Sequence, residues 1–367
     1  MNPILSAISE DGDIYKFTIS GLNVSLANAI RRTILTDIPT VAIFTENYDD
    51  NQCTIQINNT RLHNEILKQR ISCIPIHITE LDVLPGKYIL ELDMQNNTDT
   101  MIIVTTENFR IRNKLNGNYL TTDEVRRIFP FNPKTKSFID FARLRPMIGD
   151  TIPGEQIKLT AEFSIRTAKE NSTFNVVSKC AYGNTPDPIK AKQIWDELEN
   201  VSRSENMTQD EIDTQKANFN LLDAHRHFMP DSFDFVIQTV GVYENKDIIK
   251  KACAVLQRKL IDIIQAIDAD TIPIIHSETT MEFGFDIILE NEDYTIGKIL
   301  EYLLYEKYYV KDKVMTFCGF KKFHPHNSES TIRVAYVQNA DKRMVAQHLR
   351  VACVESSDIF KRIHGMF

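Results

Sequence analysis

In the first part of the chain, the spacing of apolar residues changes from the two-residue repeat of a strand to the repeat of a helix. Residues 13–20 alternate apolar and polar side chains, which is typical of a strand with one buried face. In the helical stretch that follows, the apolar positions recur every fourth residue: Leu26, Ile30 and Ile34. Ser25 is the expected N-cap of this helix, and Pro39 ends it. Further strands and a helix at 59–71 complete a compact α+β unit.

Strand-like runs with polar and proline-bearing connectors dominate the middle of the chain. Between residues 81 and 150 they predict a mostly β insertion domain. Alternation resumes at 156–166. Residues 184–230 are polar and charged around a helix-compatible segment at Trp195, so we expect a surface excursion there.

A long amphipathic helix follows this excursion. Alternation at 233–243 indicates a strand, and a helical period runs from 245 to 267. The apolar stripe of this helix includes Leu256, Leu260 and Ile264. Such a stripe is stable in water only when another element covers it, so we expect a partner helix.

The opening pattern returns near the C-terminus. A strand at 281–289 is followed by a polar turn and a helix that begins at Thr295, and a closing helix runs from 341 to 363. Each half is therefore a strand, a helix, a sheet and a long terminal helix. We predict an α+β fold in which these two related units pack together in one chain. The expected joint core is Leu26, Ile30, Ile34, Leu256, Leu260, Ile264, Thr295, Gly297, Val345, Leu349 and Ile363.

Composition and charge limit the function classes. With 43% hydrophobic and 25% charged side chains, the 367 residues fit two or three ordinary globular domains. No apolar run approaches the ~18 residues of a membrane span. The net charge of −8 argues against a broad phosphate-binding face. From Lys311 onward, however, ten basic and five acidic residues leave a basic segment, which suits a solvated helix face, an acidic partner or nucleic acid.

No catalytic or metal signature emerges from the motifs. The six cysteines are widely spaced and are expected to be small buried residues in a reducing compartment. The close histidine pairs, at 225 and 227 and at 324 and 326, lack further ligands at zinc spacing. Glycine-rich phosphate loops and nucleophile motifs do not occur. The sequence therefore predicts no metal, no cofactor and no catalytic residue.

Arg31 and Arg32 lie beside the apolar stripe of the first helix. Guanidinium groups in this position can bind carboxylates or main-chain carbonyls of a partner while their aliphatic stems pack. For the pair alone, a solvated helix face is the alternative.

The order of residues 24–43 and 69–76 resembles the signature of the RNA polymerase alpha family, which includes the D subunit of archaeal RNA polymerase and the third-largest subunit of RNA polymerase II. Residues 292–303 and 317–326 resemble its small partner, the archaeal L subunit or the eleventh subunit of RNA polymerase II. The chain thus resembles both halves of a heterodimer. In the first half the match is carried by Asn28, Arg31, Arg32, Pro39, Thr40, Arg70 and Pro75, and the resemblance implies that they bind other polymerase subunits.

The chain departs from the family at a few positions. Ser72 stands where the family usually has glycine, and Lys298 and Glu301 replace the small partner's usual Asn and Arg. Some relatives have a four-cysteine zinc or iron–sulfur site in the insertion, whereas this chain has no cysteine between Cys73 and Cys180. The resemblance therefore does not change the expectation of a metal-free protein.

The resemblance also implies a domain organisation. Residues 1–80 and 151–270 correspond to a D-like (alpha-like) dimerisation domain, and residues 271–367 to an L-like one, paired in cis. Residues 81–150 form the insertion and 184–230 the surface excursion. The halves would pack through their long terminal helices.

The implied function is a non-catalytic assembly platform of a DNA-directed RNA polymerase, whose catalytic residues lie in other subunits. Its partners would be the largest, second-largest and small polymerase subunits, with DNA contacted only through the complex and no membrane. Fusion of the two halves resembles the arrangement in large DNA viruses, so we expect a viral subunit in the host cytoplasm (virus factory) and the virion, with the nucleus as the alternative. A stand-alone soluble enzyme with an unrecognised active site is the alternative function.

Overall fold

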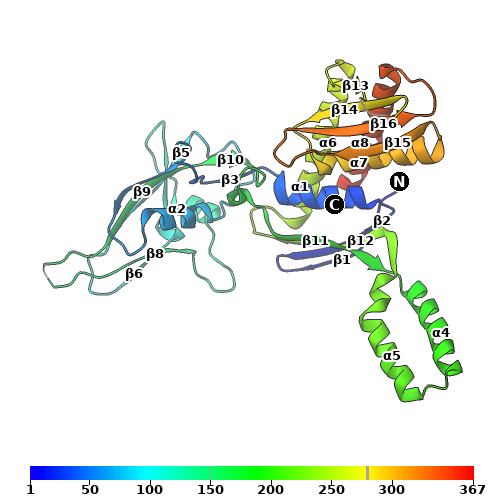
Figure 1. Ribbon diagram of the computed structural model, residues 1–367. Helices are drawn as coiled ribbons and strands as arrows, with labels where there is room; N and C mark the ends of the chain where they lie inside the picture. The colour runs from blue at the N-terminus through cyan, green and yellow to red at the C-terminus, as the bar shows by residue number, and fades with distance from the viewer. Residues whose placement is uncertain (150, 278–280) are drawn as a thin grey trace. The chain divides into compact units, whose positions relative to one another are not determined.

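The computed structural model describes residues 1–149, 151–277 and 281–367. The chain forms two compact units, each with its own sheets (Figure 1). Unit 1 consists of Met1–Ile34, Lys179–Gln238 and Asn245–Phe367. Unit 2 consists of Leu35–Ser178 and Thr239–Glu244.

The first sheet of unit 1 has the strand order β1-β2-β12-β11. The strands are β1 (Ile4–Asp11), β2 (Ile14–Ser20), β11 (Val177–Pro186) and β12 (Phe228–Thr239). Strand β2 pairs antiparallel with both β1 and β12. Its alternate residues Tyr15, Phe17 and Ile19 are buried, which confirms the strand predicted from alternation.

Helix α1 (Val24–Thr36) follows this sheet and confirms the helix expected from residue 25. The capping residue lies earlier in the chain than predicted. The side-chain oxygen Oδ1 of Asn23 accepts a hydrogen bond from the Ser25 N–H at 2.8 Å. Asn23 rather than Ser25 therefore satisfies a free N–H group at the start of the helix.

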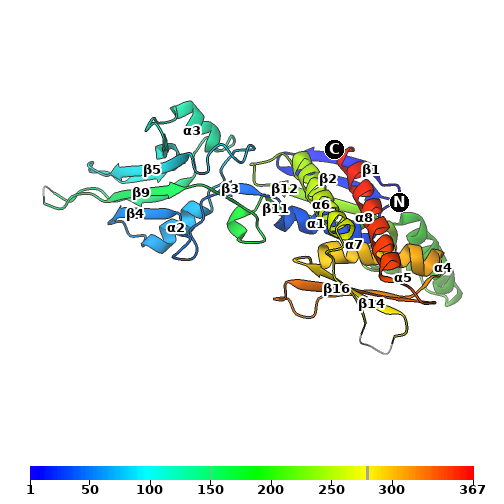
Figure 2. The same cartoon turned by 90° about the horizontal axis from the view of Figure 1, so that it is seen from above.

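The second sheet of unit 1 has the antiparallel order β13-β14-β16-β15. The strands are β13 (Ile274–His276), β14 (Gly284–Glu290), β15 (Met315–Lys321) and β16 (Glu329–Tyr336). Helix α7 (Tyr294–Leu304) continues into the π-helical turn η4 (Tyr305–Lys311), and α8 (Lys342–His364) closes the chain. Helices α7 and α8 lie against one face of this sheet (Figure 2).

Helices α6 (Asn245–Asp268) and α8 pack against each other in the centre of unit 1. The predicted core residues of α1, α6, α7 and α8 are buried, with one exception. That exception is Ile264, which is only partly buried, because Ile263 occupies the inward position in that turn of α6. The apolar stripes thus face each other as amphipathic helices require.

Two helices rather than one occupy residues 184–230. Helices α4 (Pro188–Ser204) and α5 (Gln209–Leu221), followed by η3 (Asp223–Arg226), form a helical hairpin (Figure 1). Its small core consists of Trp195, Ile212 and Phe219. Sequence analysis missed α5 because its buried apolar residues are a full seven residues apart and the rest of the helix is polar.

Unit 2 is built mainly from antiparallel strands. In the part of the chain that the structure describes, its sheets have the orders β4-β9-β5-β7, β6-β8 and β10-β3. The strands are β3 (Thr40–Ala42), β4 (Cys53–Asn58), β5 (Tyr88–Gln95), β6 (Ile102–Thr105), β7 (Arg110–Asn113), β8 (Asp140–Leu144), β9 (Gln156–Glu162) and β10 (Ser164–Arg166). The helices are α2 (Asn64–Ser72), α3 (Thr122–Ile128) and the short turns η1 (Thr106–Asn108) and η2 (Ser172–Phe174).

Residues 81–150 contain mostly strands, but they share their main sheet with neighbouring segments. Strand β9 lies between β4 and β5, so strands from both sides of residue 80 pair in one sheet. The compact units therefore divide at Ile34 and Ser178 rather than near residues 80 and 150.

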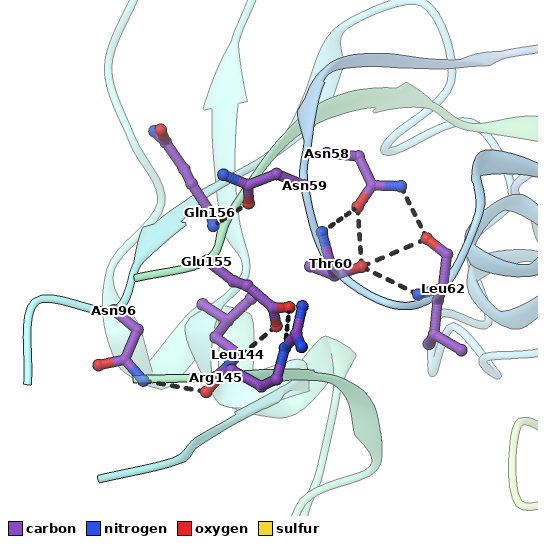
Figure 3. Close-up of polar contacts among 9 residues, drawn as sticks. All are labelled: Asn58, Asn59, Thr60, Leu62, Asn96, Leu144, Arg145, Glu155 and Gln156. Carbon is purple, nitrogen blue, oxygen red and sulfur yellow. Dashed lines mark hydrogen bonds and ion pairs between the residues drawn. The ribbon is translucent and has the colours of Figure 1, made fainter. Parts of the chain in front are cut away.

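A polar network fixes the loops at one end of this sheet (Figure 3). The buried carboxylate of Glu155 accepts from the main-chain N–H of Arg145 at 2.8 Å and pairs with the Arg145 side chain. Asn96, also buried, donates to the main-chain oxygen of Leu144 at 2.9 Å. These contacts satisfy polar groups that burial would otherwise leave without partners. They are a structural support for the loops.

Candidate partner-binding surface

Helix α1 holds Arg31 in a defined orientation on its partly exposed side. The Arg31 Nε atom donates to Asn28 Oδ1 at 3.0 Å, three residues earlier in the helix. Both side chains are partly buried. In the part of the chain that the structure describes, the terminal Nη atoms of Arg31 have no hydrogen-bond partner. Arg31 thus keeps donors that could bind a carboxylate or carbonyl oxygen.

Arg32 contacts the C-terminal part of its own unit. Its Nε atom donates to Thr295 Oγ1 at 2.9 Å, and its Nη2 atom lies 3.0 Å from Asp293 Oδ2. Asp293 is also the N-cap of α7, since its Oδ1 accepts from the Thr295 N–H at 2.8 Å. Arg32, expected as a docking residue, therefore connects α1 to the start of α7. No pattern in the sequence indicated this contact.

We predict a measurable but small coupling between Arg32 and Asp293. Their side chains are 36% and 27% exposed, so water screens the pair and about 1 kcal/mol of coupling is expected. A double-mutant cycle with Arg32→Ala and Asp293→Ala, measured by urea unfolding, gives this value. The more exposed pair Arg226 and Asp223 is the control and should show almost none. Strictly additive effects of the two substitutions would contradict the contact.

Gly297 is required for the packing of α7 on β15. A Cβ atom at this position would lie 2.1 Å from the Phe320 ring, which is far inside a van der Waals contact. We expect Gly297→Ala to lower the free energy of unfolding by about 1–3 kcal/mol through overpacking. Adding Phe320→Leu should restore part of the loss because it removes the ring. An unchanged melting temperature of Gly297→Ala would refute the tight contact.

The other predicted partner-binding residues lie in unit 2. The main-chain oxygen of Pro39 accepts from the Tyr243 hydroxyl at 3.0 Å, and Thr40 is buried in β3. Arg70 is exposed on α2, yet its Nε and Nη2 atoms donate to the main-chain oxygens of Phe141 and Asp140 at 2.7 and 2.8 Å.

Arg70 therefore holds β8 against α2, a role that no spacing in the sequence indicated. Pro75 is partly buried between the buried residues Ile74 and Ile76. Binding of other subunits by these residues stays a prediction.

The cysteines are mostly unreactive in this fold. Burial raises the pKa of the Cys53 thiol to about 11 and that of Cys180 to about 12, so both stay protonated at neutral pH. Cys73, by contrast, is exposed, which differs from the expectation that all six are buried.

Metal binding has no candidate ligand set within residues 1–149, 151–277 and 281–367, where no group of three or more His, Cys, Asp or Glu residues is placed to hold an ion. We predict that elemental analysis of the pure protein finds no stoichiometric zinc or iron. One tightly bound zinc per chain would contradict this. In the same described residues, no helix is long and apolar enough to cross a membrane.

Residues 16–260 match the family model of the RNA polymerase Rpb3/Rpb11 dimerisation domain. The chain belongs to this family. The matched region runs from β2 to α6 and so includes the first helix, unit 2 and most of the long helix of unit 1. Strands β13 to β16 and helices α7 and α8 lie beyond it.

Similar proteins agree with this family. DNA-directed RNA polymerase subunit Rpo3 of Methanosphaera stadtmanae is 24% identical over 285 residues, which cover 71% of this chain and 97% of Rpo3. RNA polymerase II subunit RPB3 of Schizosaccharomyces pombe is 22% identical, covering 69% of this chain and 84% of RPB3. Subunit RPAC1 of Bos taurus RNA polymerases I and III is 24% identical over half of this chain. The protein is an Rpb3-like, non-catalytic subunit of a multisubunit DNA-directed RNA polymerase.

Proposed function

We propose that this chain is the assembly platform of its polymerase and supplies both the D-like and the L-like half in one polypeptide. The supporting observation is the packing of α6, where the family match ends, against α8, which lies outside that match. A dimerisation domain exposes an apolar helix face that needs a partner. Here α8 and α7 of the same chain supply that partner, so the halves pair in cis.

The platform then nucleates association of the largest and second-largest subunits. The available donors of Arg31 on α1 support a contact with a large subunit, and Asn28 orients that guanidinium. Small polymerase subunits are further partners, and DNA is contacted only through the assembled complex. The stand-alone enzyme left open by the sequence does not fit a chain of this family.

We further propose that the polymerase is that of a virus. The support for this is the fusion of two halves that resemble separate cellular subunits. Under this proposal the protein acts in the host cytoplasm, at the virus factory, and is packaged in the virion, with the nucleus as the alternative site.

Omission of the chain from a reconstitution tests the platform function. The two largest subunits are expressed together, with and without this chain, and their association is measured by size-exclusion chromatography. We expect a stable complex of the large subunits only when the chain is present. If the large subunits assemble equally well without it, the proposed function is wrong.

A further inference from the structure

The two sheets of unit 1 differ in the face that points away from the helices. On the first sheet, Thr18 Oγ1 donates to Asp234 Oδ1 at 2.7 Å. The Thr185 hydroxyl donates to the same carboxylate at 2.9 Å and lies 2.8 Å from the Ser232 hydroxyl. These polar groups on neighbouring strands bind one another and so are satisfied within the sheet.

The corresponding face of the second sheet has the exposed ring of Phe317 beside the ion pair of Arg333 and Asp286. Phe317 and Gly319 of β15 lie opposite Ala335 and Arg333 of β16. The alternate residues of β15, Cys318 and Phe320, point to the other side of the sheet, toward the helices. Phe317 is 38% exposed, and Phe323, just beyond the strand, is 63% exposed. Helices α7 and α8 lie on the opposite face (Figure 2). Neighbouring exposed apolar side chains on one face are a feature of protein interaction sites.

Phe317 lines two hollows on this face. One, of about 340 Å³, also includes Met281, Phe283 and Val337. The other, of about 330 Å³, includes Gly319 and Phe323. A Cβ atom on Gly319 would lie 2.9 Å from the Phe317 ring, so this glycine lets the ring lie over the sheet and shape the second hollow.

The first hollow includes a residue with an unfavourable backbone conformation. Phe283 has a φ of +52°, a left-handed conformation that is unfavourable for a bulky side chain. Phe283 is also 39% exposed.

The two hollows differ in charge. Glu282 is the charged residue of the first hollow, whereas Lys321 and Arg333 line the second. Asp286 neutralises Arg333 through two hydrogen bonds of 2.6 and 2.7 Å. Lys321 lies with its Nζ 4.5 Å from the Phe323 ring centre and has no carboxylate partner among residues 1–149, 151–277 and 281–367. A ligand that covers both hollows should therefore have a negative charge beside the second hollow and a positive charge or no charge beside the first.

We propose that this face, defined by Phe317, Phe323, Phe283, Val337 and Lys321, docks a polypeptide segment with an apolar side chain for each hollow and a carboxylate beside Lys321. Single-stranded nucleic acid fits less well, because it needs a continuous basic groove. Here Asp286 cancels Arg333, and Glu282 would repel phosphate. This surface is separate from Arg31 on α1 and adds a second docking site to the proposed platform.

Peptide selection on the full-length chain tests this proposal. A phage-displayed library of random peptides is selected on the immobilised protein, and the recovered peptides are synthesised for affinity measurement. We expect sequences with two apolar side chains and an Asp or Glu next to one of them. Their binding to a Phe317→Ser, Phe323→Ser variant should be at least ~30-fold weaker, because exposed aromatic anchors carry most of the affinity of such contacts.

Two further variants provide the controls. Ile4→Ser removes an exposed apolar side chain, 61% exposed, from the first sheet and should leave peptide binding unchanged. Lys321→Glu should weaken the acidic peptides and favour basic ones. Both variants and the double variant replace exposed residues, and thermal melting confirms that they fold.

Several results would overturn the proposal. One is that the selected peptides bind the double serine variant as tightly as they bind the wild-type protein. Another is that the selection returns no sequence with both acidic and apolar side chains. Phe317-dependent binding of a fluorescent oligouridine would assign the face to nucleic acid. A wild-type dimer that becomes monomeric in the double variant would assign it to a second copy of this chain. The peptide selection uses no polymerase subunit. A negative selection would therefore not argue against the platform function, and a negative reconstitution would not change how the selection is interpreted.

Discussion

Leu260→Asp is expected to unfold unit 1. Leu260 is fully buried on α6, the helix that packs against α8. The substitution removes about 2–3 kcal/mol of apolar burial and adds the larger cost of a carboxylate without a partner in an apolar core. Together these reach about 5 kcal/mol or more, a large part of the ~5–15 kcal/mol that stabilises a typical folded protein. Both halves should be lost together because they share this core.

The adjacent residue offers a matched control. Ile261 is 44% exposed on the same helix, so Ile261→Asp introduces the same charge in the same chain context and should change stability by less than about 1 kcal/mol. Circular dichroism melting and the soluble yield of both variants are the measurements. A soluble Leu260→Asp protein that melts at the wild-type temperature would show that α6 and α8 do not form the joint core.

Arg31→Ala is expected to weaken binding of the second-largest subunit by roughly 30-fold to several thousand-fold. Truncating a charged group with a hydrogen-bonded partner at an interface typically costs ~2–5 kcal/mol, at ~1.4 kcal/mol per decade of affinity. Folding should be preserved, because the buried residues Leu26, Ile30 and Ile34 are unchanged. Affinity is measured by titrating the purified variant against the isolated second-largest subunit.

The Arg32→Ala variant distinguishes residues that bind another subunit from residues that stabilise unit 1 itself. The contacts of Arg32 with Thr295 and Asp293 lie within unit 1, so we expect a small loss of stability and a smaller effect on binding than for Arg31→Ala. If Arg31→Ala binds the subunit normally and melts normally, Arg31 belongs to a solvated helix face. The double substitution should combine both losses.

Helical periodicity predicted the long helices well, for a physical reason. The stripes of α6 and α8 repeat over many turns, so the period is evident without any knowledge of the partner. Short or polar elements showed no such signal. Strand β1 is exposed along nearly its whole length, and α5 has only two buried residues, so neither shows a regular apolar pattern.

Contacts between distant segments could not be predicted from local patterns. Arg32 and Asp293 are 261 residues apart, and their meeting depends on how α7 is placed against α1. The expected domain boundaries differ from the compact units for the same reason. Strand β9 pairs with both β4 and β5. This pairing places segments that are far apart in the sequence in one sheet, and the alternation within each strand does not show which strands will pair. Arg31 was noticed because it lies beside the apolar stripe of its helix, but a docking role was favoured over a solvated face only because the order of residues around it resembles a family signature.

The composition of the native complex tests the central claim most directly. The chain is affinity-tagged in its natural source and isolated under mild conditions, and its partners are identified and quantified by mass spectrometry. An assembly subunit with both dimerisation halves should co-purify with equimolar amounts of the largest and second-largest polymerase subunits and with no separate small dimerisation partner. Recovery of the chain as an isolated monomer, or with a separate L-like subunit bound to it, would contradict the account.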